Sequence, residues 1–277
     1  RGGTQLAPRV AGDVSPLPRR GAGGEGITRR RYLTIAAAIT LLLTAGLYLL
    51  QPNTPTLEYA TGNSERLEFD LTDGTHVTLN ANSRLTLAGN DWNGGDRDVV
   101  LDGEAFFDVA KAQENGQARP FRVHTSGAVI HVLGTRFNVK NRRGADRVYL
   151  EEGSVSVNWT GTTLPETNLL PGEMVERHMA DDHPVHLPAR KPEGEIAWRA
   201  GHLLFDRLPL DEALAEVSDI YGIDLRCADD HLAKQELTSA GIPVDNLPLA
   251  IRLLETALDL KIEGVENSST YWVTAAE

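Results

Sequence analysis

The feature that most constrains this chain is an uninterrupted apolar run near its start. Three arginines, residues 29–31, precede nineteen residues without a charge, residues 32–50, and Pro52 follows. A helix of that length, at about 1.5 Å of rise per residue, covers roughly 28 Å, which is close to the hydrocarbon thickness of a bilayer. The run lacks both the small residues of a signal-peptide cleavage site and the polar face of a core helix. We therefore expect a single transmembrane helix at residues 32–50.

The charge on the two sides of this run predicts its orientation. Residues 1–31 contain seven arginines against Asp13 and Glu25, a balance of +5, whereas the whole chain carries −12 and the part after the run therefore carries −17. Because basic flanks are retained in the cytoplasm, we expect residues 1–31 to be a cytoplasmic basic linker and residues 51–277 to lie outside. An acidic outer part argues against nucleic-acid binding. The single cysteine, Cys227, excludes an intramolecular disulfide.

Short strands dominate residues 65–180. In "RLEFDLTDGTHVTLNANSRLTL" the apolar residues Leu67 and Phe69 alternate with polar ones before the turn Asp73-Gly74, and Val77 resumes the alternation after it. Period-two alternation on both sides of an Asp-Gly pair is typical of a β-hairpin. Similar patterns recur up to residue 180 without a helical stretch of useful length, so we predict an all-β domain at 65–180. Residues 181–195, which contain three prolines, are predicted to be a linker.

Residues 196–277 change to a helical period. In "RLPLDEALAEVSDIYGIDL" the apolar residues between Leu210 and Tyr221 share one helical face, and Gly222 is a favourable stop. The plan repeats 39 residues later, where Leu247-Pro248-Leu249 matches Leu208-Pro209-Leu210. With short strands around each helix, this predicts a small α+β domain of two β-α-β units. A domain of this size is suited to holding another protein by a helix face or a sheet edge.

The motifs, taken together and in order, resemble a known family. After the arginine-flanked run come "LTDGTHVTLNANSRL", "GEAFFDVAK", "PFRVHTSGAVIHVLGTRFNV", "EEGSVSV", "LLPGEMVE" and "FDRLPLDEALAEVSDIYGIDL". Over residues 29–277 the chain resembles the FecR-type transmembrane anti-sigma factors and sigma regulators of cell-surface signalling. The C-terminal domain is similar to the short signalling domain of secretins and TonB-dependent proteins. The resemblance implies a regulator in the inner (cytoplasmic) membrane, with a cytoplasmic N-terminus and a periplasmic C-terminus.

The resemblance also implies partners. In the family, the signalling domain of an outer-membrane TonB-dependent transporter contacts the C-terminal domain of the regulator, which controls a cytoplasmic ECF sigma factor in iron or siderophore sensing. The helical sigma-binding domain that precedes the membrane helix in the family is not recognisable in residues 1–28, which are too short and too irregular for it. Either the chain is truncated at its start, so that the sigma factor is bound by a cytoplasmic part not present here, or this member has lost direct control of the sigma factor. The alternative is a membrane-anchored structural adaptor of an envelope transport or secretion assembly. Neither function requires a cofactor or a small-molecule substrate.

One pair of residues is a candidate for covalent chemistry. In the family, several members cleave themselves at a Gly-Thr pair, which here would be Gly134-Thr135 in "VLGTRFNV". The threonine hydroxyl would attack the preceding carbonyl, and water would then hydrolyse the ester. His131 is a candidate proton-transfer partner. The alternative is a glycine bulge followed by a threonine of ordinary strand character. No residue set for substrate turnover is present, so we do not expect an enzyme.

Two further sets of residues have the composition of binding sites. The exposed face of the predicted helix 210–221 carries Asp211, Glu212, Glu216 and Asp219, which are candidates for partner binding. The alternative is a solvated acidic face. His178, Asp181, Asp182, His183 and His186 form a loose group of metal-ligand residue types. Because they lie in or beside a proline-containing linker without fixed geometry, we favour a polar linker and expect no metal site.

Overall fold

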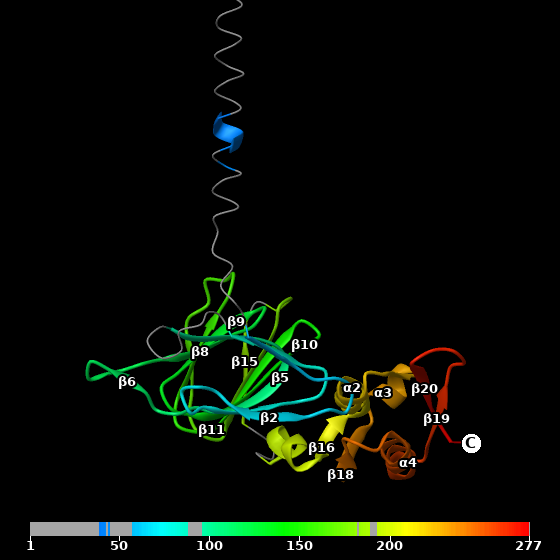
Figure 1. Ribbon diagram of the computed structural model, residues 1–277. Coiled ribbons are helices and arrows are strands. Elements are labelled where there is room, and N and C mark those ends of the chain that lie inside the picture. Colours follow the sequence, from blue (N-terminus) through cyan, green and yellow to red (C-terminus); the bar gives the residue numbers. More distant parts are fainter. Residues whose placement is uncertain are drawn as a thin grey trace, which may run out of the picture. The chain divides into compact units, whose positions relative to one another are not determined.

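The computed structural model describes residues 39–42, 44, 57–87, 96–181, 183–188 and 193–276 (Figure 1). Residues 1–53 and residues 54–277 form separate compact units. The second unit contains the strands and helices described below. We refer to residues 57–188 as the β region and to residues 193–276 as the C-terminal module.

The predicted transmembrane helix at residues 32–50 needs correction. Within that range only residues 39–42 and 44 are described, and they are helical; the remainder lies outside the described residues. Across the described part of the chain, no helix is long and apolar enough to cross a bilayer. An apolar run supports a membrane span only when it forms one continuous helix of about 20 residues. The fold class with a single-pass helix and the placement in the inner membrane are therefore not retained.

The β region consists of short strands around one long strand, β5. The strands are β1 Leu57–Ala60, β2 Leu67–Asp70, β3 His76–Leu79, β4 Arg84–Leu87, β5 Arg97–Asp108, β6 Gln113–Glu114, β7 Gln117–Ala118, β8 Phe121–His124, β9 Ala128–Val132, β10 Arg136–Arg142, β11 Ala145–Glu152, β12 Val155–Trp159, β13 Thr167–Leu169, β14 Glu173–His178 and β15 Val185–Pro188. Thirteen of these described strands join in one sheet, whose main order is β13-β12-β9-β8-β5-β10-β11-β14-β15. Strands β6 and β7 form a separate hairpin.

Strand β5 joins the two halves of this sheet. Its first half pairs with β4 and, in parallel, with β8, whereas its second half pairs with β3 and β10. The change of partners occurs at Gly103, whose φ is +109°. A Cβ at this position would lie 2.7 Å from the Cα of Ser83, so the close approach of the two chains requires glycine.

The core of the β region follows from the alternation along its strands. Val99, Leu101, Ala105 and Phe107 of β5 all point into the apolar core, which also contains Phe137. The rings of Phe107 and Phe137 stack with their centroids 5.2 Å apart. The even-numbered residues of β5 point the other way. Val100 is exposed, but Phe106 is fully buried because the C-terminal module covers that part of the strand.

The C-terminal module contains two small sheets and two main helices. Its elements are the 3₁₀ helix η1 Gly194–Ala200, β16 His202–Pro209, α2 Leu210–Tyr221, β17 Asp224–Cys227, α3 Asp230–Ala233, β18 Glu236–Pro243, α4 Leu247–Leu258, β19 Leu260–Gly264 and β20 Thr270–Ala275. Strands β16 and β18 pair antiparallel, and β17, β20 and β19 form a three-stranded sheet. The helices bury the apolar faces that the sequence periodicity predicted, including Leu214 of α2 and Leu254 of α4.

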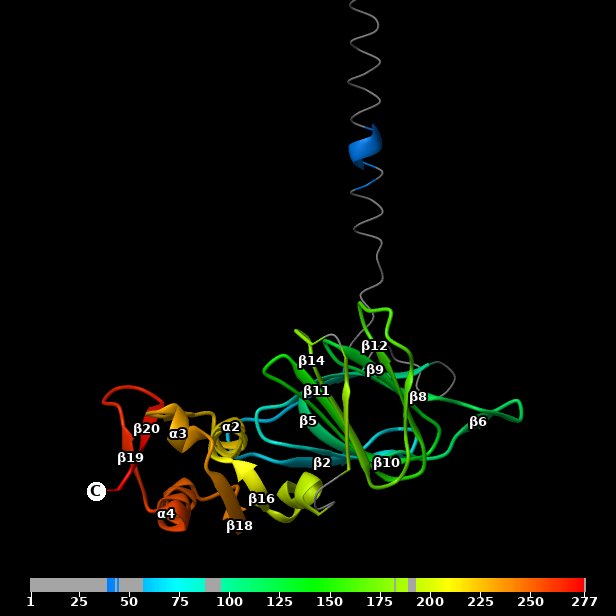
Figure 2. The same ribbon diagram turned by 180° about the vertical axis from the view of Figure 1, so that it is seen from behind.

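Two sides of the module have different surroundings. Figures 1 and 2 show α2 on the side that meets the β region and α4, β19 and β20 on the opposite side. Ala81 and Phe106 of the β region join the apolar cluster of the module. The residues predicted as a linker also contain secondary structure, because β15 pairs with β14 at the edge of the large sheet and η1 begins at Gly194.

Candidate functional site

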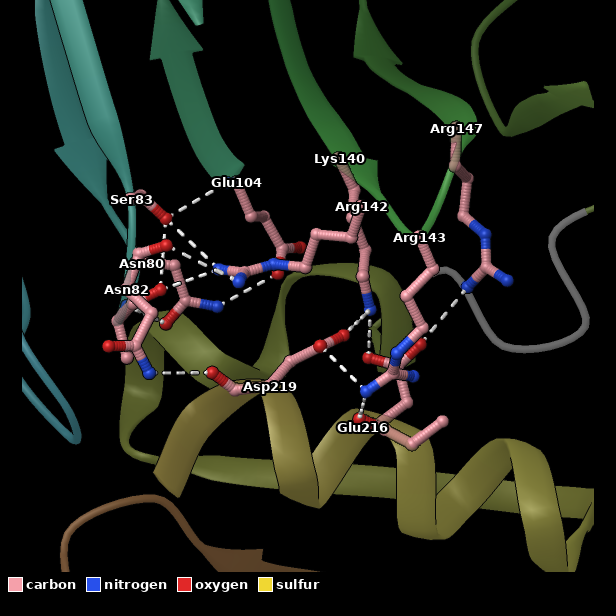
Figure 3. A network of polar contacts seen from close by, with 12 residues as sticks. Asn80, Asn82, Ser83, Glu104, Lys140, Arg142, Arg143, Arg147, Glu216 and Asp219 are labelled. Atoms are coloured by element: carbon pink, nitrogen blue, oxygen red, sulfur yellow. Dashed lines mark hydrogen bonds and ion pairs between the residues drawn. The ribbon is translucent and has the colours of Figure 1, made fainter. Parts of the chain in front are cut away.

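The most elaborate polar site lies where helix α2 meets the β region, and we call this contact the joint (Figure 3). It is built from the β10–β11 hairpin, which carries four cationic residues, and from the outer face of α2, which carries carboxylates. The cationic residues are Lys140, Arg142, Arg143 and Arg147. The chain turns back between β10 and β11 at Arg143 and Gly144, both with positive φ, so all four cations come from one continuous hairpin.

The β region supplies the C-terminal cap of helix α2. The last carbonyls of a helix have no partner within the helix, and its C-terminus carries a partial negative charge. No basic residue occurs in the last turn of α2. Instead, the Asn82 side chain donates to the carbonyls of Asp219 (2.9 Å) and Ile220 (3.3 Å), and the main-chain N–H of Ser64 donates to Ile220 (2.8 Å). The helix is therefore completed by groups more than 130 residues earlier in the chain.

Ion pairs form a second layer of the joint. Lys140 bonds to the carboxylate of Glu216, and its Nζ lies 3.5 Å from Asp219 Oδ2. Arg143 donates to Asp219 Oδ1 (2.7 Å) and to the carbonyl of Ala215 (2.6 Å). Arg147 lies 3.6 Å from the Glu216 carboxylate. Because the side chains of Lys140 and Asp219 are only 12% and 13% exposed, these charges are poorly screened by solvent.

The network continues into the β region through a buried carboxylate. Glu104 of β5 accepts hydrogen bonds from the side-chain amides of Asn80 and Asn138, both at 2.8 Å. Its main-chain N–H donates to the hydroxyl of Ser83 (2.9 Å), which also accepts from Arg142 (3.0 Å). The polar groups beneath the joint are thus held in place by hydrogen bonds that do not involve the module.

The charges at the joint shift each other's pKa. Burial alone would raise the pKa of Glu216, but Lys140 and Arg147 lower it to about 2. Burial alone would lower the pKa of Lys140, but Glu216 and Glu104 raise it. Glu195 of η1 behaves differently, because burial raises its pKa and Arg147, at 3.9 Å, offsets this only in part. At neutral pH Glu216 and Lys140 are therefore held firmly in their charged forms.

The predicted partner-binding residues on α2 separate into two pairs. Asp211 and Glu212 lie exposed in the first turn, where carboxylates favour the helix dipole. Glu216 and Asp219 lie in the joint and contact the β region of the same chain. None of the four is tested as a binding residue for another protein, so that role stays a prediction.

The sequence patterns did not predict the exposed apolar residues on the side of the module opposite the joint. On α4, Leu249 and Leu253 are 41% and 37% exposed, and on β20 Trp272 is 44% exposed. We use the term distal surface for these exposed side chains of α4 and β20 together. Leu249 and Leu253 are four residues apart and therefore share one helical face. On the sheet, Trp272 is flanked in register by Arg226 of β17 and Glu263 of β19. Tryptophan and arginine are enriched in protein-binding surfaces.

The Gly134-Thr135 pair lies between β9 and β10 rather than within a strand. A Cβ on Gly134 would lie 2.2 Å from Cγ of Lys111, so the space beside this residue is filled. Thr135 is buried, and its hydroxyl donates to the carbonyl of Ser154 (3.0 Å). Gly153, with φ of +100°, brings the β11–β12 turn against the pair, because a Cβ there would lie 3.1 Å from the Gly134 carbonyl oxygen. Self-cleavage at this pair stays a prediction.

His131, the suggested proton-transfer partner, lies on β9 opposite Arg122 of β8 and Ser156 of β12. Burial lowers the pKa of its imidazole, and the nearby Arg122 lowers it further. The Thr135 hydroxyl donates to the Ser154 carbonyl rather than to this ring. A neutral His131 is suited to accepting a proton, but among the described residues no hydrogen bond joins it to the Gly134-Thr135 pair.

The other residues singled out in the sequence have structural surroundings. Within the described residues, no group of histidine, cysteine, aspartate or glutamate side chains could hold a metal ion. Asp182 lies outside the described residues, and His178 pairs with Glu176 at 3.2 Å. Burial raises the pKa of the Cys227 thiol to about 11, so it is protonated at neutral pH and a poor nucleophile.

Comparisons with known proteins agree with this fold. Residues 58–156 match the family profile described as "FecR protein". Two crystal structures of a "putative anti-sigma factor" from Parabacteroides distasonis ATCC 8503 share the fold, with TM-scores of 0.66 and 0.65 and 22% sequence identity. In each comparison the matched region covers 80% of this chain and 100% of the Parabacteroides chain. No curated protein sequence matches the chain.

The FecR match spans the strands from β1 to the beginning of β12 and therefore includes the long strand β5, the β10–β11 hairpin and the Gly134-Thr135 pair. The motifs that suggested the resemblance lie largely in this range. The resemblance is confirmed over this part of the chain, where residues 58–156 match the FecR family.

Proposed function

We propose that this chain transmits a signal from the signalling domain of an outer-membrane TonB-dependent transporter to an ECF sigma factor, as in iron or siderophore sensing. The observation that carries the proposal is the FecR domain at residues 58–156. The name of the Parabacteroides protein supports a sigma factor as the target of regulation. The chain would act by binding these partners and not by turning over a substrate.

The distal surface is the part of the C-terminal module best suited to receive the transporter. The side of α2 that carries Glu216 and Asp219 is occupied by the β region. The opposite side exposes Leu249, Leu253 and Trp272, whose burial against a partner would be favourable. We therefore place the transporter-binding surface on α4 and β20, and assign the joint to contacts within the chain.

Calorimetric titration of the full chain with the transporter's signalling domain tests this placement. Leu253→Asp should weaken binding at least about tenfold, because a charge would have to be desolvated at the centre of the contact. Leu170→Asp is the matched control, since Leu170 is also exposed but belongs to the β13–β14 turn of the β region. Equal affinities of the two variants would contradict the placement.

The sigma-factor arm of the proposal needs its own experiment. An ECF sigma factor should be recovered from a cell lysate with the tagged regulator, and transcription from the promoters of that sigma factor should change when the regulator is removed. If transcription were the same with and without the regulator, this arm of the proposal would be wrong. The transporter-binding result would not be affected.

Self-cleavage would supply an irreversible step in this pathway. Thr135 Oγ1 would attack the Gly134 carbonyl carbon, the amide C–N bond would break, and the Thr135 amine would take up the hydroxyl proton. Water would then hydrolyse the ester, leaving a Gly134 carboxylate and a free Thr135 N-terminus. Intact-mass spectrometry should show both fragments for the wild type and for Thr135→Ser, and only the full chain for Thr135→Ala. An identical fragment pattern in Thr135→Ala would exclude the reaction.

A further inference from the structure

The joint contains many polar contacts, whereas the β region and the C-terminal module each have an apolar core of their own. The apolar core of the β region is made entirely from β-region residues. Among the residues that the structure describes, the apolar cluster of the C-terminal module draws only Ala81 and Phe106 from the β region. Hydrogen bonds and ion pairs also join the two bodies here, among them the pairs of Lys140 with Glu216 and of Arg143 with Asp219 (Figure 3). Each body therefore retains nearly all of its own core if the joint opens.

The ion pairs that cross the joint have one polarity. Lys140, Arg143 and Arg147 of the β region face Glu195, Glu216 and Asp219 of the module, while Arg147 also pairs with Glu176 within the β region at 2.7 Å. Attraction between the two sets favours the closed arrangement, but closing it removes both sets from water. That desolvation offsets much of the gain, so a buried ionic contact stabilises an interface less than its number of ion pairs suggests.

The cap of helix α2 can also be exchanged with solvent. In the closed arrangement Asn82 and Ser64 donate to the carbonyls of Asp219 and Ile220. Water can replace both donors at an exposed helix end, so α2 can persist without them. Opening would expose the two β-region residues of the module's apolar cluster, Ala81 and Phe106, and the Arg199 side chain that stacks on Phe106, 3.7 Å from the ring centroid.

From these observations we infer that the joint is an electrostatic latch, which releases the C-terminal module from the β region while both bodies stay folded. In the closed state the latch covers Phe106 and the Glu216–Asp219 face of α2. In the open state both are accessible. The inference concerns the chain alone and does not depend on which partner the distal surface binds.

Amide hydrogen exchange on the full chain can detect opening directly, because one amide reports on the joint, one on the β region and one on the C-terminal module. The Ser64 N–H donates across the joint to Ile220. The Val109 N–H donates to Thr135 within the β region, and the Val244 N–H donates to Gly201 within the module. Opening of the latch exposes the first amide and leaves the other two protected.

Two variants weaken the latch from opposite sides. Lys140→Met removes a cation of the β region but keeps an apolar stem, and Glu216→Gln removes its partner charge on α2. Each should accelerate exchange at Ser64 by at least about tenfold, equivalent to about 1.4 kcal/mol, with Val109 and Val244 unchanged. Lys261→Met is the matched control, because Lys261 pairs with Glu263 on the opposite side of the module. It should leave all three amides unchanged.

Two results would overturn the inference. If Val109 and Val244 accelerated by the same factor as Ser64, the joint would be part of one cooperative fold. If neither Lys140→Met nor Glu216→Gln accelerated Ser64, the ion pairs would not hold the joint closed. The two variants change different bodies, so a folding defect in one of them leaves the other as the test.

Discussion

A buried ion pair in the β region offers the sharpest test of how this fold is held together. Arg97 of β5 and Asp73, in the turn between β2 and β3, lie 2.9 Å apart, with side-chain exposures of 0% and 4%. The Arg97 guanidinium also donates to the carbonyls of Ala110 (2.8 Å) and Pro120 (3.3 Å). Asp73 is the anionic member of this group. Its loss therefore leaves a buried cation with neutral partners.

The perturbation is Asp73→Asn, which removes the charge but keeps the shape and one carbonyl oxygen. The direct Coulomb attraction across 2.9 Å is about 6 kcal/mol at an effective dielectric constant of 20. Breaking a buried pair from one side typically costs about 3–5 kcal/mol, and the retained hydrogen-bond acceptor places Asp73→Asn near the lower end. We therefore expect a loss of about 3 kcal/mol, or roughly 6–12 °C in Tm for a unit of this size.

Urea unfolding of the wild type and the variant, followed by circular dichroism, measures this difference. Asp70→Asn is the control, because Asp70 pairs with His76 at 2.8 Å but is 76% exposed. It should change the free energy of unfolding by less than about 0.5 kcal/mol. A loss below about 1 kcal/mol for Asp73→Asn, or equal losses for both variants, would refute the reasoning.

Three further predictions follow from the same structure. Gly103→Ala should destabilise the chain by about 1–3 kcal/mol in urea unfolding, because it places a Cβ against Ser83 at a positive φ, whereas Gly144→Ala, with open space around it, should cost less. Glu216 should stabilise the joint fully above pH 4.5, its ordinary pKa, and this stabilisation should be lost as the pH falls toward about 2, its pKa in the folded chain. The loss would be measured as a falling protection factor of the Ser64 amide. Unchanged protection between pH 5 and pH 2 would contradict this prediction. Because burial raises the pKa of Glu195, its protonated form is favoured in the folded chain, and the free energy of unfolding falls as rising pH removes that proton. Glutamine resembles the protonated form, so Glu195→Gln should increase the free energy of unfolding at pH 7 and leave it unchanged near pH 3. A Glu195→Gln variant that is less stable than the wild type at pH 7 would show that its pair with Arg147 dominates.

Local patterns were sufficient for features whose partners are near in sequence. The alternation around Asp73-Gly74 predicted a hairpin, and β2 and β3 pair with Phe69 opposite Val77, with Gly74 at φ +84°. The helical period of residues 210–221 and the stop at Gly222 predicted α2, which spans those residues and has Gly222 as its left-handed C-cap. In both cases the apolar period determines which face is buried.

Contacts between distant residues were not predictable in this way. Glu216 and Asp219 fall on the polar face of α2, which a helical period assigns to solvent, but Lys140 contacts both from 76 and 79 residues away. The same difficulty applies to Phe106 and Phe107. Alternation places them on opposite faces of β5, but it cannot show that the C-terminal module buries the outer one.

Proline also misled the sequence reading of residues 181–195. Three prolines favoured a linker, but Val185–Pro188 form β15 at the edge of the large sheet. Edge strands tolerate proline because one row of their N–H groups faces solvent. The apolar run at 32–50 showed a related limit, since its length alone predicted a continuous helix that the described residues do not contain.

The central claim is that the chain receives its signal on the distal surface of the C-terminal module while the opposite side of α2 is held by the β region. Hydrogen-exchange footprinting of the full chain, with and without the transporter's signalling domain, tests it most directly. We predict new protection in α4 around Leu253 and in β20 around Trp272, and none in the β10–β11 hairpin. New protection confined to that hairpin, with α4 and β20 unchanged, would contradict the account.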